Sequence, residues 1–124
     1  MATLKKFEDV HAWQKTRVMV KEIYTLSSLS AFSKDYGLKD QIRRCGVSIM
    51  ANIAEGYGRK SRKEFAYFLN IAHGSAAELQ SHLYIALDLG YIDKDSFDHL
   101  YAETEEISKM ILGLQNYLRK LVRS

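Results

Sequence analysis

The sequence predicts an all-α protein, an antiparallel up-down four-helix bundle in which residues 1–124 form a single domain. Three observations predict this fold. The 124 residues include no proline, so only glycines and polar caps can interrupt a helix. Apolar residues recur at three- and four-residue steps in four segments, about 8–29, 38–55, 61–88 and 94–121. Short connections at 56–61 and 90–93 make the last three helices sequential antiparallel neighbours.

The first two predicted helices each carry one apolar stripe. The stripe of the first helix consists of Trp13, Thr16, Met19, Val20, Ile23 and Leu26. A serine-rich connection that ends at Gly37 leads to the second helix, whose stripe is Leu38, Ile42, Cys45, Ile49 and Ile53. Small residues on its flanks let a neighbouring helix approach closely: Gly46, Ser48, Ala51 and Ala54. We expect Gly56 and Gly58 to end this helix, because glycine tolerates the left-handed conformation.

The third predicted helix begins at a capping-box pattern, Ser61 followed three residues later by Glu64. One apolar stripe contains Phe65, Phe68, Leu69, Ala72, Leu79, Leu83 and Ala86, and a second group contains Tyr67, Ile71, Ala77, Tyr84 and Ile85. A helix that is apolar on more than one face must be covered on more than one face. We therefore expect the chain to associate with copies of itself. Gly74, which costs about 1 kcal/mol relative to alanine in mid-helix, indicates a close backbone crossing.

The fourth predicted helix follows Gly90, with Asp93 as its N-cap. Its seam is formed by Leu100, Ile107, Ile111, Leu114, Leu118 and Leu121. The helix is also acidic, with Asp93, Asp95, Asp98, Glu103, Glu105 and Glu106. These acids indicate an exposed face whose first residues suit the helix dipole. The alternative is a docking face for a basic partner or for the basic turn of a neighbouring subunit.

Several classes of protein are not supported by the sequence. No apolar run is long enough to cross a membrane, and the segment MATLKKFEDVHAW has acids and a tryptophan where a signal peptide would be apolar; we expect a cytoplasmic protein without membrane contact. Cys45 is expected to be a small packing residue. A di-iron bundle needs two Glu-x-x-His pairs, but Glu8 and His11 form the only one, and no second pair faces Glu78 and His82. We expect no enzyme activity, catalytic residues, cofactor or metal.

Polar residues also occur inside the apolar segments, and packing explains them without chemistry. Ser48 and Asn52 in the second helix can bond to polar side chains in the third, namely Asn70, His73 and Ser75. Such a network would fix the register of the two helices.

The charge is segregated along the chain. Residues 1–63 contain 13 Lys and Arg against 6 Asp and Glu, whereas residues 64–124 contain 5 against 9. The candidate nucleic-acid-binding residues are Arg59, Lys60, Arg62 and Lys63 in the turn, Arg43 and Arg44 in the second helix, and Lys15, Arg17 and Lys21 in the first. Such groups can neutralise phosphates without reading bases. The alternative is a solvated turn with internal ion pairs, and for Arg43 and Arg44 we favour pairing with Glu55, Glu64 or Glu78.

The segments QIRR, SIMANIAEGYGRKSRKEFAYFLNIAHGSAAELQSHL and ALDLGYI, together with WQK near the start, closely resemble the bacterial four-helix bundle proteins called 23S rRNA intervening sequence proteins. The resemblance covers roughly residues 7–121. Met50 departs from it, because the family commonly has proline after Ser-Ile. Some members are encoded within large-subunit ribosomal RNA genes. A related branch, the accessory variability proteins of diversity-generating retroelements, forms a pentameric barrel that binds nucleic acid and a reverse transcriptase. The resemblance thus implies a homopentamer with a basic surface.

Two functional hypotheses follow. The first is an oligomeric, RNA- or DNA-associated scaffold that binds phosphates through its basic residues. The second is a protein-interaction module that docks a partner such as a polymerase or nuclease without touching nucleic acid.

Overall fold

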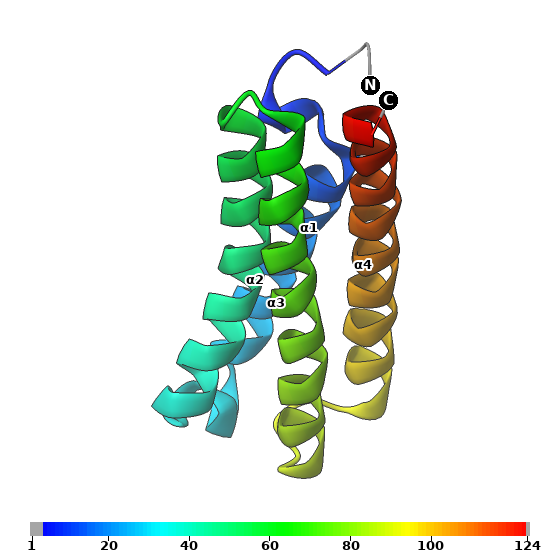
Figure 1. The fold of residues 1–124 in the computed structure, drawn as a ribbon. Helices are drawn as coiled ribbons and strands as arrows, with labels where there is room; N and C mark the ends of the chain where they lie inside the picture. The colour runs from blue at the N-terminus through cyan, green and yellow to red at the C-terminus, as the bar shows by residue number, and fades with distance from the viewer. Residues whose placement is uncertain (1–3, 124) are drawn as a thin grey trace.

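The computed structural model describes residues 4–123 of the chain, and within this range it consists of helices. The long helices are α1 (His11–Ser27), α2 (Tyr36–Gly58), α3 (Arg62–Asp88) and α4 (Lys94–Arg123), and the short 3₁₀ helices are η1 (Phe7–Asp9) and η2 (Ser30–Lys34). Successive long helices run in opposite directions along the bundle (Figure 1). The predicted all-α four-helix bundle is therefore confirmed. The predicted domain also included residues 1–3 and 124, which lie outside the described residues.

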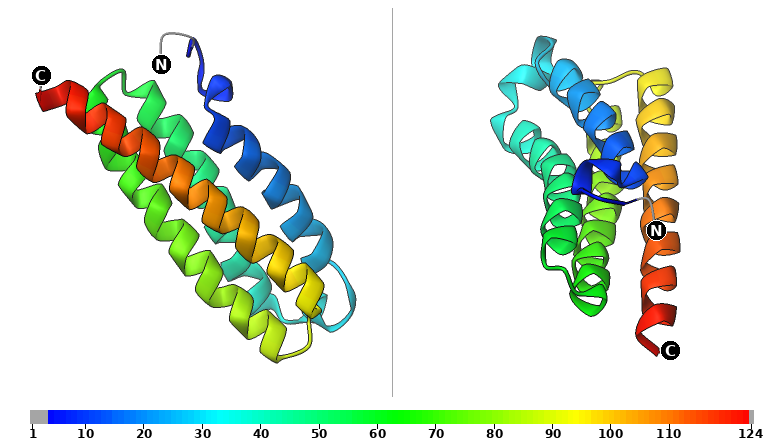
Figure 2. Two further views of the ribbon diagram at one scale, coloured as in Figure 1. Left: turned by 90° about the vertical axis from the view of Figure 1, so that its right-hand side faces the viewer. Right: turned by 90° about the horizontal axis from the view of Figure 1, so that it is seen from above.

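The four long helices surround one apolar core. α2 and α3 pack extensively on each other, as do α3 and α4, while α1 closes the bundle against α2 and α4. Fully buried side chains from all four helices fill the centre: Met19, Ile49, Ile53, Leu69, Leu79, Ile107 and Ile111. The described N-terminal segment, the α2–α3 turn and the end of α4 lie at one end of the bundle (Figures 1 and 2). None of the described helices contains an apolar stretch sufficient to cross a membrane.

The first two helix boundaries differ from those predicted. α1 begins at His11 instead of residue 8, because residues 7–9 form η1 and Val10 has an extended backbone. Most of the serine-rich connection folds into η2. α2 begins at Tyr36, where the Leu38 amide donates to Asp35 Oδ1 over 3.1 Å. This cap places Gly37 inside the first turn of α2.

The predicted roles of three glycines were wrong, in whole or in part. α2 passes through Gly56 and ends at Gly58, but neither glycine is left-handed, and the left-handed residue in the following turn is Lys60, with φ of 57°. Gly56 is buried because α3 crosses it closely: a Cβ there would lie 2.7 Å from Phe68 Cβ and 3.0 Å from Phe65 Cδ1. At Gly74, where a close crossing was predicted, no atom outside its own helix backbone lies within 4 Å of such a Cβ.

The predicted caps at Ser61 and Asp93 and the glycine after α3 are confirmed. Ser61 Oγ accepts a hydrogen bond from the Glu64 amide at 3.2 Å, and Gly90 follows α3 with φ of 75°. Asp93 Oδ1 accepts from the Ser96 amide at 2.8 Å. The hydrogen bonds from Ser96 lower the pKa of the Asp93 carboxyl below its ordinary value. These caps depend on neighbours three residues away, which is why the sequence displays them.

The predicted polar network between α2 and α3 forms in part. Ser48 Oγ and Ser75 Oγ are hydrogen-bonded at 2.8 Å, and Asn52 Nδ2 donates to Ser48 Oγ at 3.1 Å. Asn70 is exposed, and neither its side chain nor that of His73 forms a hydrogen bond with another residue in the described range. The network thus consists of one interhelical contact.

Candidate nucleic-acid interface

The turn between α2 and α3 presents unpaired positive charge at one end of the bundle. Lys60, Arg62 and Lys63 are exposed, and none of them is ion-paired with another residue in the part of the chain that the structure describes. Arg59 differs, because its Nη2 lies 3.1 Å from Glu55 Oε1 and its guanidinium lies 5.0 Å from the centre of the Phe68 ring. This is an internal ion pair of the kind that the alternative interpretation of the turn expects. Exposed pairs of this kind are worth little and exchange easily.

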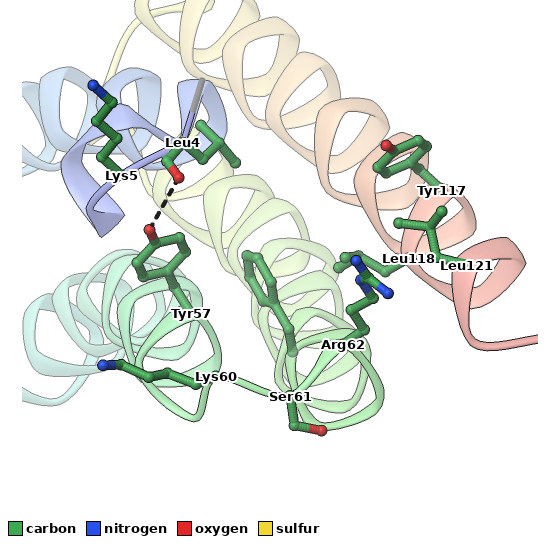
Figure 3. A pocket seen from close by; sticks show the side chains of 10 residues that line it. Leu4, Lys5, Tyr57, Lys60, Ser61, Arg62, Tyr117, Leu118 and Leu121 are labelled. Carbon is green, nitrogen blue, oxygen red and sulfur yellow. Dashed lines mark hydrogen bonds between the residues drawn. The ribbon is translucent and has the colours of Figure 1, made fainter. Parts of the chain in front are cut away.

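A cleft of about 620 Å³ opens beside this turn. Its apolar floor is formed by Leu4, Tyr57, Phe65, Tyr117, Leu118 and Leu121, and its rim includes Lys5, Lys60 and Arg62 (Figure 3). Tyr57 Oη donates a hydrogen bond to the Leu4 carbonyl at 3.3 Å, which holds the N-terminal segment against the end of α2. This contact brings Lys5 to the end of the bundle that carries Lys60, Arg62 and Lys63. The sequence prediction missed Lys5, because residues 5 and 60 meet only in the folded chain.

Arg43 has a structural role, but with partners other than those predicted. Its Nε donates to Ser27 Oγ at 2.8 Å and its Nη2 to Ser28 Oγ at 3.0 Å. The guanidinium also lies 4.3 Å from the centre of the Tyr24 ring. Arg43 thus ties α2 to the C-terminal turn of α1. The expected pairing with Glu55, Glu64 or Glu78 was wrong.

Arg44, the next residue, is exposed, and its side chain forms no hydrogen bond or ion pair within residues 4–121. Pairing with Glu55, Glu64 or Glu78 was wrong for this residue too. Its charge is available to a ligand, but it lies roughly four turns of α2 from the basic turn, about 24 Å along the helix.

The three basic candidates on α1 do not form one binding strip. Lys15 Nζ pairs with Glu106 Oε2 of α4 at 3.4 Å. The Arg17 guanidinium lies 5.9 Å from the centre of the Trp13 ring. Lys21 lies at a different cleft, of about 470 Å³, next to acidic side chains of α1 and α4. The structure therefore brings together only the candidates in the turn.

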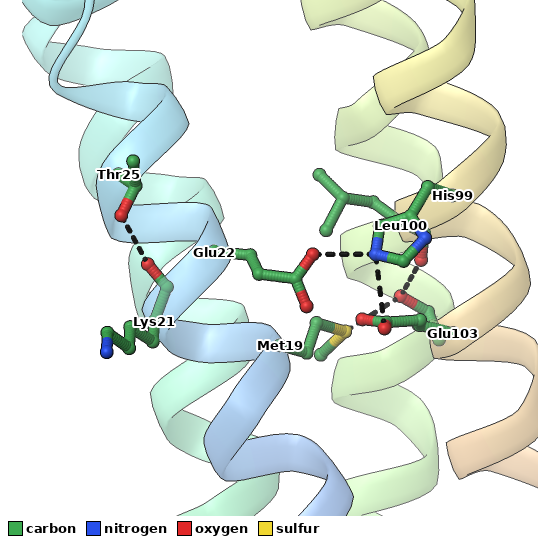
Figure 4. Close-up of polar contacts among 8 residues, drawn as sticks. Met19, Lys21, Glu22, Thr25, His99, Leu100 and Glu103 are labelled. Atoms are coloured by element: carbon green, nitrogen blue, oxygen red, sulfur yellow. Dashed lines mark hydrogen bonds and ion pairs between the residues drawn. The ribbon is translucent and has the colours of Figure 1, made fainter.

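Most of the acidic side chains of α4 have partners within the chain. Asp98 pairs with Lys94, Glu105 accepts from Gln80, and Glu106 pairs with Lys15. His99 Nε2 lies 2.7 Å from Glu22 Oε2 and 3.2 Å from Glu103 Oε1, which joins α4 to α1 (Figure 4). Burial and the neighbouring Glu22 raise the pKa of the Glu103 carboxyl above its ordinary value. These contacts favour the interpretation of a solvated face with internal pairs over a docking face.

Comparisons with known proteins agree with this architecture. The sequence model of the 23S rRNA-intervening sequence protein family matches residues 8–113. A crystal structure of a protein of unknown function from the S23 ribosomal protein family of Bacteroides thetaiotaomicron is similar, with a TM-score of 0.78 and 27% sequence identity. That similarity covers 85% of this chain and 95% of the other. No curated protein matches the chain significantly. Because the family match spans most of the sequence and the four helices agree with it, the chain belongs to the 23S rRNA-intervening sequence protein family.

Proposed function

We propose that this protein is a non-enzymatic, oligomeric scaffold of the cytoplasm that binds the phosphate backbone of nucleic acid, foremost RNA, through its basic end. Here the basic end means Lys5, Lys60, Arg62 and Lys63. The observation that carries the proposal is the presence, within residues 60–63, of three exposed cations that have no ion-pair partner among the described residues. Unpaired lysines and arginines can exchange bound counterions for phosphates at little cost, which is the main source of non-specific affinity.

The outward face of α3 supports the oligomeric part of the proposal. Tyr67, Ile71 and Ile85 lie along this face and are 61%, 37% and 44% exposed. Gly74 is also exposed on α3, and its missing side chain leaves room for another molecule to approach. Contact between copies would remove these apolar groups from water. It would also place several basic ends in one particle, and the family resemblance suggests five.

The basic end is suited to contacts that do not read sequence. Its cations belong to the α2–α3 turn, to the first turn of α3 and to the N-terminal segment, whereas reading a base edge requires an element that enters a groove. We therefore expect binding that depends steeply on salt and weakly on sequence. The measurement is fluorescence anisotropy with labelled single- and double-stranded RNA and DNA, titrated with protein at several salt concentrations.

The decisive comparison is between two triple variants. In the first, Lys60, Arg62 and Lys63 become glutamine, and the logarithmic salt slope should fall by about 2–3, since each lost phosphate contact removes about 0.7–0.9. In the matched control, Lys34, Lys94 and Lys109 become glutamine, which removes the same charge elsewhere and should leave most of the affinity. Equal loss in both variants would show that only net charge matters. Absence of binding to every nucleic acid at low salt would favour the protein-interaction module instead.

A further inference from the structure

The seam between α2 and α3 brings together three side chains that are common metal ligands. Cys45 of α2 donates a hydrogen bond from Sγ to Glu78 Oε2 of α3 over 3.3 Å. One turn further along α3, His82 Nε2 lies 3.6 Å from the same Glu78 oxygen. One ligand atom from each residue lies within 4.8 Å of the other two. α2 and α3 pack against each other along the bundle (Figure 1).

The ring of His82 lacks the partners that its position requires. Both of its nitrogens are buried, and neither forms a hydrogen bond with any residue in the described part of the chain. The separation of 3.6 Å from Glu78 is longer than a hydrogen bond. Buried polar atoms almost always have partners, so an orphaned pair calls for a ligand.

We propose that Cys45, Glu78 and His82 form a Zn²⁺ site. Thiolate, imidazole and carboxylate are the three ligand types that zinc uses in proteins, at about 2.0–2.3 Å from the metal. In a tetrahedral site, ligand atoms at such distances lie roughly 3.3–3.7 Å from one another. Two of the three separations, 3.3 Å and 3.6 Å, fall in this range, and the third is no longer than 4.8 Å. The soft sulfur ligand favours Zn²⁺ over Mg²⁺ or Ca²⁺.

The surroundings of the three residues define what the site can do. Cys45 is buried, whereas the Glu78 side chain is 57% exposed, so the three residues lie at the edge of the core and solvent reaches at least one of them. Burial and the hydrogen bond to Glu78 raise the pKa of the Cys45 thiol to about 12. The metal-free chain therefore holds a neutral thiol. Zinc would bind the sulfur as a thiolate, and the displaced proton would pass to solvent.

The test is a metal titration of the purified, metal-free full-length protein. Competition with a chromogenic chelator should give one tight Zn²⁺ per chain. Cys45→Ser, Glu78→Gln and His82→Gln should each weaken binding by at least about 10-fold, because even residues that merely orient a ligand contribute 10- to 100-fold. Titration with Co²⁺ should produce a sulfur-to-cobalt charge-transfer band that disappears in Cys45→Ser. The band should persist in a folded variant that is changed only at an exposed residue outside the site. Glu78 is mostly exposed, so Glu78→Gln keeps the test valid if Cys45→Ser fails to fold.

A matched control comes from the second cluster of ligand-type residues, Glu22, His99 and Glu103. His99→Gln should leave the tight Zn²⁺ affinity unchanged. The proposal is overturned if tight binding survives all three changes at Cys45, Glu78 and His82, if His99→Gln abolishes it, or if cobalt gives no thiolate band. The zinc test is also separate from the test of nucleic-acid binding. The variant in which Lys60, Arg62 and Lys63 become glutamine should bind zinc normally, whether or not it binds nucleic acid.

Discussion

Replacing Gly56 with alanine tests the closest contact in the bundle. The new Cβ would lie 2.7 Å from Phe68 Cβ, an atom fixed to the backbone of α3, and 3.3 Å from the Phe65 carbonyl oxygen. Neither neighbour can turn away as a flexible side-chain end could, so α2 and α3 must separate. Overpacking of this kind costs about 1–3 kcal/mol, whereas the higher helix propensity of alanine contributes about 1 kcal/mol in the opposite direction. We expect the free energy of unfolding to fall by up to about 2 kcal/mol.

Gly113→Ala is the matched control, because Gly113 lies inside α4 and a Cβ added to it would have no atom of another element within 4 Å. There the propensity term acts alone, and the protein should gain about 0.5–1 kcal/mol. Both variants should be unfolded with urea and followed by far-ultraviolet circular dichroism at one protein concentration. If Gly56→Ala gains as much stability as Gly113→Ala, α2 and α3 are not held as closely as the structure indicates.

The remaining predictions concern polar side chains. Arg43→Ala should lower the free energy of unfolding by about 1–3 kcal/mol, because it removes the hydrogen bonds to Ser27 and Ser28 and the contact with Tyr24. Arg44→Ala should change the free energy of unfolding by less than about 0.5 kcal/mol. Equal melting temperatures for the two variants would contradict the structural role of Arg43. Glu103→Gln should raise the melting temperature at neutral pH. The raised pKa of Glu103 means that the folded chain holds this proton more tightly than the unfolded chain, so the stability it contributes is lost as the pH rises through that pKa. The gain should vanish below about pH 4, where the carboxyl is protonated in both states; a gain that is the same at both pH values would refute this reasoning.

The parts of the fold that the sequence predicted are those encoded by neighbouring residues. The stripe around Ile49 and the caps at Ser61 and Asp93 depend on residues within a turn or two, and all are present. Gly56 shows the limit of this reasoning. A glycine near the end of an apolar segment resembles a stop signal, but its reason is a contact with Phe68 on another helix.

In the candidate sites too, features encoded by neighbouring residues were predictable, and contacts between distant residues were not. The basic turn was predictable because its four cations all lie within residues 59–63. The partner of Arg43 was not, because Ser27 lies 16 residues away. The position of Lys5 was not either, because the bond that holds its segment, from Tyr57 to Leu4, spans 53 residues. The Cys45–Glu78 contact spans 33 residues and likewise has no local signature.

The proposed scaffold depends on association of copies through the outward face of α3, and the mass of the particle in solution tests this most directly. Sedimentation velocity or light scattering of the full chain at micromolar concentration should give a multiple of the mass of one chain, with five copies suggested by the family resemblance. Tyr67→Glu combined with Ile71→Glu should reduce that mass, because both side chains lie on the exposed face. The mass of a single chain, unchanged by these substitutions, would contradict the proposal.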